Sequence, residues 1–264
     1  ILWSKDGWVG QRIGRYKIEN ILGGGGMGRV FLARDVVLQR EVALKTISES
    51  FQEARESGTL EQFLREAQAV ATIVHPNVVR VYDVVHQEGV VAVAMEYVKG
   101  GTLQDLLRGE NTLPIYEICR LIAEAADGLY CAHENGLIHR DIKPANLMLS
   151  EKRQCKVVDF GATHAVEKKE LSMLEGKIIG TPHYISPEVI LGKAPLPASD
   201  IYSLGIVFWR SLAGTTPFSA KTRKELYLKH VKKKPPNIRE YRKDVPPPLV
   251  AVLDTCLQKD PSRR

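Results

Sequence analysis

The sequence predicts an α+β fold of two lobes: a small, mostly antiparallel-β lobe with one key helix, and a larger, mostly helical lobe. Two observations support this. Short β-rich segments separated by glycines or polar turns dominate the first hundred residues, and helical periodicity dominates after a Gly-Gly pair at positions 100 and 101. The joint is expected at residues 96–101. The expected domains are an N-terminal flank at residues 1–15, a small lobe at 16–98 and a large lobe at 99–264.

The small lobe is predicted to contain five strands and one helix. The strand segments are Tyr16–Leu22, Arg29–Arg34, Glu41–Ile47, Val78–Val85 and Val90–Val98. The helix is expected over Leu60–Val74, because apolar residues recur there every three or four positions. Glu66 lies on or beside this apolar stripe, so its carboxylate should need a cationic partner from the fold.

The large lobe is predicted to be mainly helical. Helical periodicity covers Thr102–Arg108, Tyr116–Glu134, Asp200–Leu212 and Leu249–Leu257, and short strand-like pieces occur at Asn146–Leu149 and Lys156–Val158. Residues 162–187 show no clear periodicity over a length greater than a typical connection, which favours a functional segment.

Composition excludes several classes of protein. With 264 residues, 44% hydrophobic and 26% charged, the chain resembles a soluble globular protein and not a fibrous or low-complexity one. No apolar run approaches the roughly 18 residues of a membrane-spanning helix. The four cysteines are scattered without metal-binding spacing, so we expect reduced thiols in a cytoplasm-like compartment, and neither a disulfide framework nor a zinc site.

Charge is distributed unevenly along the chain. The formal net charge is +6, and the excess of lysine and arginine is concentrated in residues 221–243. Such a run could meet phosphate, an acidic protein or a lipid headgroup. A solvated face without a partner is the commoner outcome for a run of charges, and it is the favoured interpretation.

A glycine-rich segment at residues 23–30 fits the pattern G-x-G-x-x-G-x-V. Glycines at this spacing let backbone N–H groups approach phosphate oxygens, although a plain flexible hairpin is an even alternative for the motif by itself. A dinucleotide-binding fold is disfavoured, because it requires a helix after the last glycine, whereas residues 29–33 predict a strand.

Lys45 lies inside the apolar strand that contains Val42. Burying an ammonium group is costly unless the group meets an anion, and Glu66 is the obvious carboxylate. A pair between Lys45 and Glu66 would fix the lysine head so that it can hold the α- and β-phosphates of a nucleotide.

A second polar motif, HRDIKPAN at residues 139–146, places a carboxylate, an ammonium and an amide in one tight loop. Asp159 follows thirteen residues later at the end of a strand. Because Mg²⁺ prefers oxygen ligands and shares them with substrate phosphates, Asn146 and Asp159 are the predicted metal ligands. Asp141 is then left to orient an attacking hydroxyl and accept its proton. His139 is expected to brace the loop, and not to act as a base or metal ligand.

These motifs occur in an order that resembles the protein kinase family, from about Tyr16 to the end of the chain. Further motifs that match the family, later in the chain, are Ser186-Pro187-Glu188, Asp200 with Gly205, and DPSRR at residues 260–264. Lys143, two residues after the loop aspartate, and GTPHY at residues 180–184 resemble the serine/threonine branch. The GGMG string at residues 25–28 is most similar to bacterial kinases of the eukaryotic-like type.

The resemblance implies an enzyme that transfers the γ-phosphoryl group of Mg-ATP to Ser or Thr hydroxyls of proteins, itself included, with Mn²⁺ as an alternative metal. The implied catalytic residues are Lys45, Glu66, Asp141, Lys143, Asn146 and Thr181. The implied nucleotide-binding residues are Gly23, Gly25, Gly28, Val30, Ala43, Lys45, Met95, Glu96, Val98 and Met148. The resemblance further implies that Glu188 and Arg264 form a buried ion pair and that Asp200 braces the catalytic loop.

Regulation by phosphorylation is also implied, because Arg140 before the loop aspartate is typical of kinases whose activation-loop phosphate fills a basic pocket. The candidate acceptors are Thr163, Ser172, Thr181 and Ser186. We hypothesise that Glu175 partly substitutes for such a phosphate, against the simpler interpretation of a solvated surface charge.

The expected partners are protein substrates and a second copy of the chain during autophosphorylation; neither a specific nucleic acid nor membrane contact by this segment is expected. The expected location is the cytoplasm, either alone or as the cytoplasmic domain of a larger membrane protein. Two rivals are a pseudokinase scaffold and a small-molecule phosphotransferase. The first would ordinarily lack Lys45, Asp141 or Asp159, and residues 180–188 resemble a peptide-docking segment, which argues against the second. The family normally continues into further helices beyond Arg264, so an incomplete large lobe is one interpretation of the chain.

Overall fold

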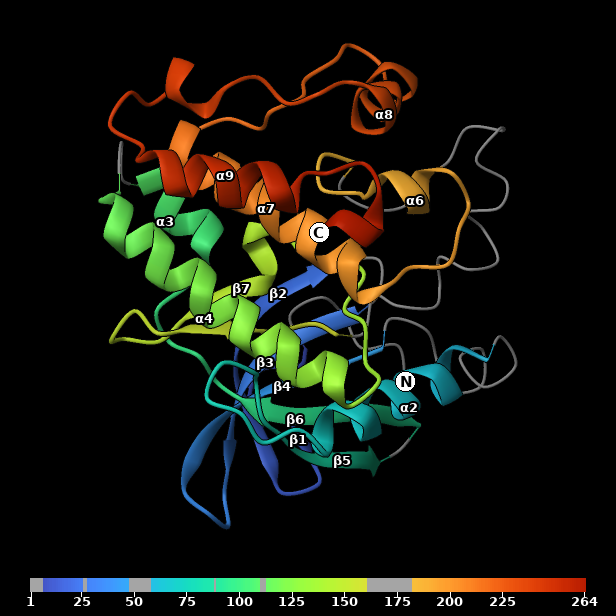
Figure 1. Cartoon of the computed structure of the whole chain (residues 1–264). Helices are drawn as coiled ribbons and strands as arrows, with labels where there is room; N and C mark the ends of the chain where they lie inside the picture. Colours follow the sequence, from blue (N-terminus) through green and yellow to red (C-terminus); the bar gives the residue numbers. More distant parts are fainter. Residues whose placement is uncertain (1–6, 26–27, 48–57, 88, 110–112, 161–181) are drawn as a thin grey trace. The chain divides into compact units, whose positions relative to one another are not determined.

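A computed structural model describes residues 7–25, 28–47, 58–87, 89–109, 113–160 and 182–264, with the side chains of residues 25, 59, 62 and 66 left out (Figure 1). The chain forms two compact units. The small unit comprises residues 1–75 and 79–99, and the large unit comprises residues 76–78 and 100–264.

The small unit contains an antiparallel sheet of six strands in the order β1-β2-β3-β4-β6-β5. The strands are β1 (Arg12–Ile13), β2 (Tyr16–Gly25), β3 (Gly28–Asp35), β4 (Arg40–Thr46), β5 (Val81–Gln87) and β6 (Val90–Glu96). Every second residue of the central strands is buried, for example Phe31 and Ala33 on β3 and Val42 and Leu44 on β4, and these side chains form the core on one face of the sheet. The predicted antiparallel-β character of this lobe is confirmed, whereas β1 was not predicted because it is too short to leave a periodic signal.

One helix, α2 (Thr59–Ala71), packs against β5 of the small unit. Leu60 on this helix and Val91 on the sheet are both buried and form a second apolar cluster. The predicted helix extended to Val74, but α2 ends at Ala71, and Val74 is 71% exposed. The predicted helix was too long because Val74 continues the apolar spacing, although it is not buried and lies beyond the last helical residue.

The strand predicted to begin at Val78 begins instead at Val81. Residues 76–78 belong to the large unit, where the Asn77 side chain donates to the Cys155 carbonyl at 2.8 Å. The Asn77 carbonyl accepts from the Val157 N–H at 2.8 Å, and Val78 forms an isolated bridge with Val157. The early part of the predicted strand is therefore wrong, because a hairpin of the large unit takes up its hydrogen-bonding groups.

The large unit is built around α7 (Pro197–Ala213), which packs against α4 (Ile115–Glu134) and α9 (Pro247–Cys256) (Figure 1). The remaining elements are α3 (Leu103–Gly109), α6 (Pro187–Ile190), α8 (Arg223–Lys232), the hairpin β7 (Leu147–Leu149) with β8 (Cys155–Val157), and 3-10 turns at Pro144–Asn146, Ile238–Glu240 and Pro261–Arg263. A Cβ at Gly205 would lie 2.8 Å from the Cys256 Cβ, so glycine is needed where α7 and α9 meet. No helix in the described part of the chain combines the length and apolar character needed to cross a bilayer.

Helix α8 lies within the segment that the sequence presented as a solvated run of charges. Its lysines and arginines are indeed mostly exposed, but Leu226, Tyr227 and His230 are buried against the rest of the large unit. Nδ1 of His230 forms a hydrogen bond with the Tyr202 hydroxyl at 3.0 Å. The rings of His230 and Phe218 meet edge-on, with their centres 5.1 Å apart. These three residues fix one side of α8 and leave the other side in solvent.

His230 makes the stability of the large unit depend on pH. Burial, with the nearby cations Lys259 and His183, lowers the pKa of His230 from 6.5 to about 3. Between these values the unfolded chain binds a proton that the folded chain refuses, so the free energy of unfolding falls as the pH falls, by up to about 1.4 kcal/mol per pH unit. Urea unfolding across this range should show a shallower acid limb for His230→Phe than for the wild type. An unchanged limb would contradict the assignment.

Candidate active site

The loop that follows α4 brings three of the predicted catalytic side chains together. The Asp141 carboxylate accepts from Lys143 Nζ at 2.5 Å and from Asn146 Nδ2 at 3.2 Å. Asn146 Nδ2 also donates to the Asp141 carbonyl at 2.8 Å. The 3-10 turn at Pro144–Asn146 causes this, because it folds the amide back over the start of the loop. The Asp141 side chain remains 25% exposed, so it can be reached from solvent.

His139 supports this loop from inside the large unit. It is fully buried; Nε2 lies 2.8 Å from the Val158 carbonyl, and Nδ1 lies 3.2 Å from the Asp141 N–H. A carbonyl only accepts and an N–H only donates, so His139 is neutral with its proton on Nε2. Both ring nitrogens are therefore occupied, and the predicted bracing role is confirmed.

Asp200 at the start of α7 holds the same loop through three hydrogen bonds. Its carboxylate accepts from the backbone N–H groups of His139 and Arg140 and from His133 Nε2, each at 2.8 Å. These donors satisfy a carboxylate that is 1% exposed and help to hold Arg140 at a φ of 68°, an uncommon conformation for a residue with a Cβ. The bracing role implied by the resemblance is confirmed. His133 was not predicted; its only signal is a histidine in the buried stripe of α4.

The two predicted metal ligands lie on neighbouring segments. The Val158 N–H donates to the Asn146 carbonyl at 3.0 Å, which places Asp159 next to Asn146 along the chain that leaves β8. Asp159 is exposed and has a φ of 62°. Since the Asn146 amide nitrogen is engaged by Asp141, its amide oxygen is the atom that could ligate a cation. Two side-chain oxygens suit a hard divalent ion such as Mg²⁺, so this donor set fits the predicted metal.

In the small unit, the glycine-rich segment forms the hairpin between β2 and β3, with Gly23 opposite Val30 and Gly25 opposite Gly28. Gly28 has a φ of 136°, and a Cβ there would lie 1.8 Å from the Thr46 carbonyl oxygen. Gly23 differs, because a Cβ at that position meets nothing within 4 Å among the described residues. The fold thus requires glycine at position 28. It does not require glycine at position 23, where a side chain would instead interfere with a bound ligand.

Substituting these two glycines separates the two requirements. We expect Gly28→Ala to lower the free energy of unfolding by roughly 1–3 kcal/mol, because the left-handed backbone and the contact with Thr46 must both relax. We expect Gly23→Ala to change it by less than about 0.5 kcal/mol while weakening nucleotide binding. Thermal unfolding and nucleotide titration of both variants measure this. Equal destabilisation by the two would contradict the distinction.

Four predicted nucleotide-binding residues share one face of the sheet. Val30 lies opposite Lys45, and Ala43 lies opposite Met95. Cross-strand partners project from the same face, and successive residues alternate. Because Leu44 points to the core, Lys45 and Ala43 point away from it together with their partners. The register therefore gathers an ammonium group and three apolar side chains on the face opposite the core.

The other predicted adenine-binding residues lie at the end of β6, just beyond it, and in β7. Glu96 ends β6, and its backbone N–H donates to the Arg80 carbonyl at 2.8 Å, so a contact of its backbone with a base edge would have to use the carbonyl. Val98 is 5% exposed. Met148 lies in β7 of the large unit, opposite Lys156, and is half-buried.

Some predicted residues fall outside what the structure describes. Glu66 lies on α2, but its side chain is not described, so the pair with Lys45 stays a prediction. Thr181, Ser172 and Glu175 lie outside the described residues altogether. Among the candidate phosphate acceptors, Ser186 is described and is only 2% exposed.

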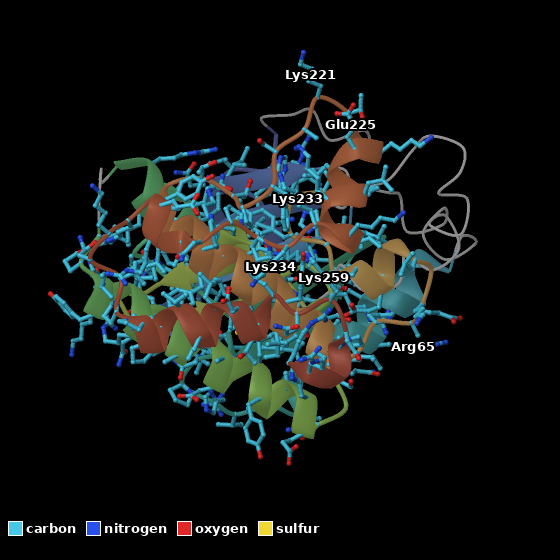
Figure 2. All side chains as sticks on the ribbon, turned by 45° about the horizontal axis from the view of Figure 1, so that its top comes forward. Arg65, Lys221, Glu225, Lys233, Lys234 and Lys259 are labelled. Atoms are coloured by element: carbon cyan, nitrogen blue, oxygen red, sulfur yellow. The ribbon has the colours of Figure 1, made fainter. Side chains whose placement is uncertain are left out.

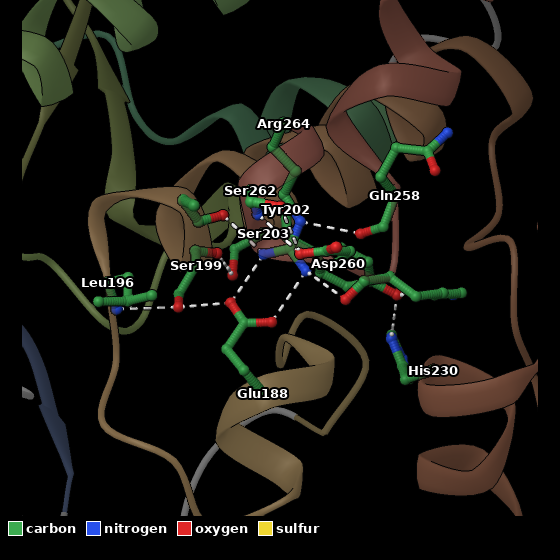
Figure 3. Close-up of polar contacts among 12 residues, drawn as sticks. Glu188, Leu196, Ser199, Tyr202, Ser203, His230, Gln258, Asp260, Ser262 and Arg264 are labelled. Carbon is green, nitrogen blue, oxygen red and sulfur yellow. Dashed lines mark hydrogen bonds and ion pairs between the residues drawn. The ribbon is translucent and has the colours of Figure 1, made fainter.

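The predicted buried pair of Glu188 and Arg264 is present and bidentate, with Nη1–Oε1 at 2.7 Å and Nη2–Oε2 at 2.8 Å (Figure 3). The two side chains are 3% and 0% exposed. Burial would raise the pKa of Glu188, but hydrogen bonds from Arg264 and Ser199 outweigh it and keep the pKa below its ordinary value. The ion pair ties α6, which follows residues 182–186, to the C-terminal 3-10 turn.

The model of the protein kinase domain matches residues 16–264 of this chain. The chain belongs to the protein kinase family. It is 35% identical over 257 residues to the serine/threonine-protein kinase PrkC of Bacillus subtilis, and the matched region covers 97% of this chain and 39% of that protein. It is 37% identical over 254 residues to the serine/threonine-protein kinase PknB of Mycobacterium leprae, covering 95% of this chain and 40% of that protein. The kinase domain thus spans about two fifths of the length of these relatives.

Family membership gives the described geometry a general chemistry. Protein kinases use ATP and divalent metal ions to phosphorylate proteins. In this kinase domain, the loop around Asp141 lies in the large unit, and the glycine-rich hairpin and Lys45 lie in the small unit. Each unit therefore carries its own part of the conserved kinase motif set.

Proposed function

We propose that this chain is a serine/threonine protein kinase that transfers the γ-phosphoryl group of Mg-ATP to Ser and Thr hydroxyls of proteins, its own included. The observation that supports this most directly is the Asp141 carboxylate, held by Lys143 and Asn146 in a loop braced from inside by His139. The names of the relatives support the choice of Ser and Thr as acceptors.

The large unit would act on the hydroxyl and on the transferred group. Asp141 orients the attacking hydroxyl and accepts its proton, because its side chain is 25% exposed and Lys143 and Asn146 both donate to the same oxygen, Oδ2. Lys143 offsets negative charge on the transferred phosphoryl group. Asn146 and Asp159 would hold Mg²⁺ or Mn²⁺, and a bound ion would supply positive charge to offset that of the phosphates. Thr181 helps to position Asp141 and the hydroxyl.

The small unit would bind the nucleotide. Gly23, Gly25 and Gly28 cover the phosphates, and Lys45, fixed by Glu66, holds the α- and β-phosphates. For the adenine ring, the small unit would supply the side chains of Val30, Ala43 and Met95, and the backbone of Glu96 and Val98 would meet the base edge. The alternation of faces around β4 supports this set, because it places Lys45 and the apolar residues together.

We place the domain in the cytoplasm, alone or as part of a larger membrane protein. All four cysteines are free thiols, as expected for a reducing compartment that also supplies ATP. Autophosphorylation would require transient association of two copies.

The test is the intact mass of the purified chain after incubation with Mg-ATP, beside Asp141→Asn, with the modified peptides mapped. Mass gains of about 80 Da each on Ser or Thr, absent from the variant and from a metal-free incubation, are expected. A wild-type chain that binds Mg-ATP but modifies neither itself nor any protein substrate would contradict the proposal. Repeating the incubation with Mn²⁺ compares the two metals.

A further inference from the structure

The net charge of the chain comes from one short segment. Residues 221–234 contain seven of the 37 Lys and Arg residues and one of the 31 Asp and Glu residues, so the rest of the chain carries 30 of each. The whole excess of +6 therefore falls on fourteen residues that form α8 and its two ends. A solvated surface needs charge, but it does not need all of the imbalance in one place.

The structure turns most of this charge outward. Lys221, Lys224, Lys232, Lys233 and Lys234 are exposed, and we call them the α8 basic face. Figure 2 shows Lys221 at one end of α8 and Lys233 and Lys234 at the other. Lys229 is not part of it, because its Nζ donates to the Ser219 carbonyl at 2.5 Å. Glu225, the single acidic residue, lies in the first turn, where it complements the helix dipole.

The α8 basic face lies on a helix whose other side is buried, and it surrounds an exposed apolar residue. The buried residues Tyr227 and His230 anchor the opposite side of the helix. Leu228, one turn from both Lys224 and Lys232, is 47% exposed. Lysines around an exposed leucine suit an acidic chain segment that contains an apolar residue.

The surface also lies beside the part of the large unit that resembles the peptide-docking segment. Helix α8 packs against α6, which begins directly after residues 182–186. The Tyr184 carbonyl, in that segment, accepts from Ser203 Oγ at 2.7 Å, so the segment is fixed to α7. A protein that docks its phosphoacceptor at residues 182–186 would have neighbouring parts of its surface within reach of α8.

We propose that the α8 basic face docks an acidic segment of the protein substrates, distant in sequence from their phosphoacceptor residue. The inference rests on the proposed function, since it names a property of the substrates of the same kinase. A protein segment fits better than a nucleic acid or a bilayer. The two residues of α8 that carry a ring, Tyr227 and His230, are both buried, so the helix offers no ring for stacking on bases or for insertion at a lipid interface.

The experiment uses a pool of degenerate peptides with one central Ser or Thr, joined by a glycine linker without any hydroxyl side chain to a tail of either glutamates or glutamines. For the wild-type chain at low salt we expect the glutamate tail to lower KM by about tenfold with little change in kcat, and salt to remove the difference. The triple variant K232Q/K233Q/K234Q should lose this preference and keep its rate on the glutamine-tailed pool. The triple variant K17Q/R108Q/K152Q removes three exposed cations elsewhere and should keep the preference.

The outcomes separate the inference from the proposed function. No phosphorylation of either pool or of the chain itself would count against the kinase activity. Phosphorylation of both pools with equal KM would overturn the docking proposal alone, as would loss of the preference in both triple variants. Binding of phosphatidylserine vesicles or duplex DNA that only K232Q/K233Q/K234Q abolishes, together with equal KM values, would assign the surface to that other partner and overturn the proposal.

Discussion

Replacing Asp141 with asparagine is expected to lower the rate of phosphoryl transfer by about 10²–10⁴-fold and to leave the affinity for Mg-ATP nearly unchanged. An amide of the same shape can still accept from Lys143, which lies 2.5 Å from the carboxylate, so the loop should keep its conformation. It cannot take up the proton of an attacking hydroxyl. The loss should therefore appear in kcat, measured on a protein substrate at saturating Mg-ATP.

Asp127→Asn is the matched control, because it makes the same change at an exposed position on α4 and should leave both quantities unchanged. Equal losses of rate and of Mg-ATP affinity in Asp141→Asn would mean that Asp141 holds the nucleotide or its metal. The role assigned to Asn146 and Asp159 would then need to be revised as well.

The elements of the small unit could be predicted largely from alternation and glycine spacing, because each strand is short and has one buried face. The start of β5 could not be predicted, since Val78 is a β-branched residue typical of a strand but forms a bridge with Val157, a partner 79 residues away. Helix α8 was missed for a different reason. Its buried residues are few, and the surrounding lysines hide the apolar face on which it packs.

The candidate site was predictable where chemistry is carried by the loop sequence itself. Asp141, Lys143 and Asn146 lie within six residues, so one turn decides their geometry. The support from His133 and Asp200 was harder to see, because it depends on how α4 and α7 cross. Asp200 came from the resemblance alone, and His133 was not found.

Replacing Glu188 with glutamine is expected to lower the free energy of unfolding by about 3–5 kcal/mol at pH 7. The Arg264 guanidinium is 0% exposed, and both of its bonds to the carboxylate would lose the opposing charge. The amide nitrogen of the glutamine would also take the place of one acceptor oxygen, so that two donors would face each other and one hydrogen bond to Arg264 would be lost. The pKa of Glu188 lies below its ordinary value of 4.5 in the folded chain. The ion pair therefore stabilises the folded chain at pH values above 4.5, and this stabilisation is lost as the pH falls through the folded pKa of Glu188.

Urea unfolding followed by far-UV circular dichroism should therefore show a difference between the wild type and Glu188→Gln that narrows at acidic pH. Glu151→Gln, the same change at an exposed turn, should shift the unfolding free energy by less than about 0.5 kcal/mol. If the cost comes from an uncompensated buried charge, the double variant E188L/R264M should recover much of it, because apolar residues of similar volume often replace a buried pair without loss. A double variant as unstable as Glu188→Gln would contradict this explanation, or mean that losing the Arg264 hydrogen bonds to the Ala198, Gln258 and Lys259 carbonyls costs as much as removing the buried charge recovers.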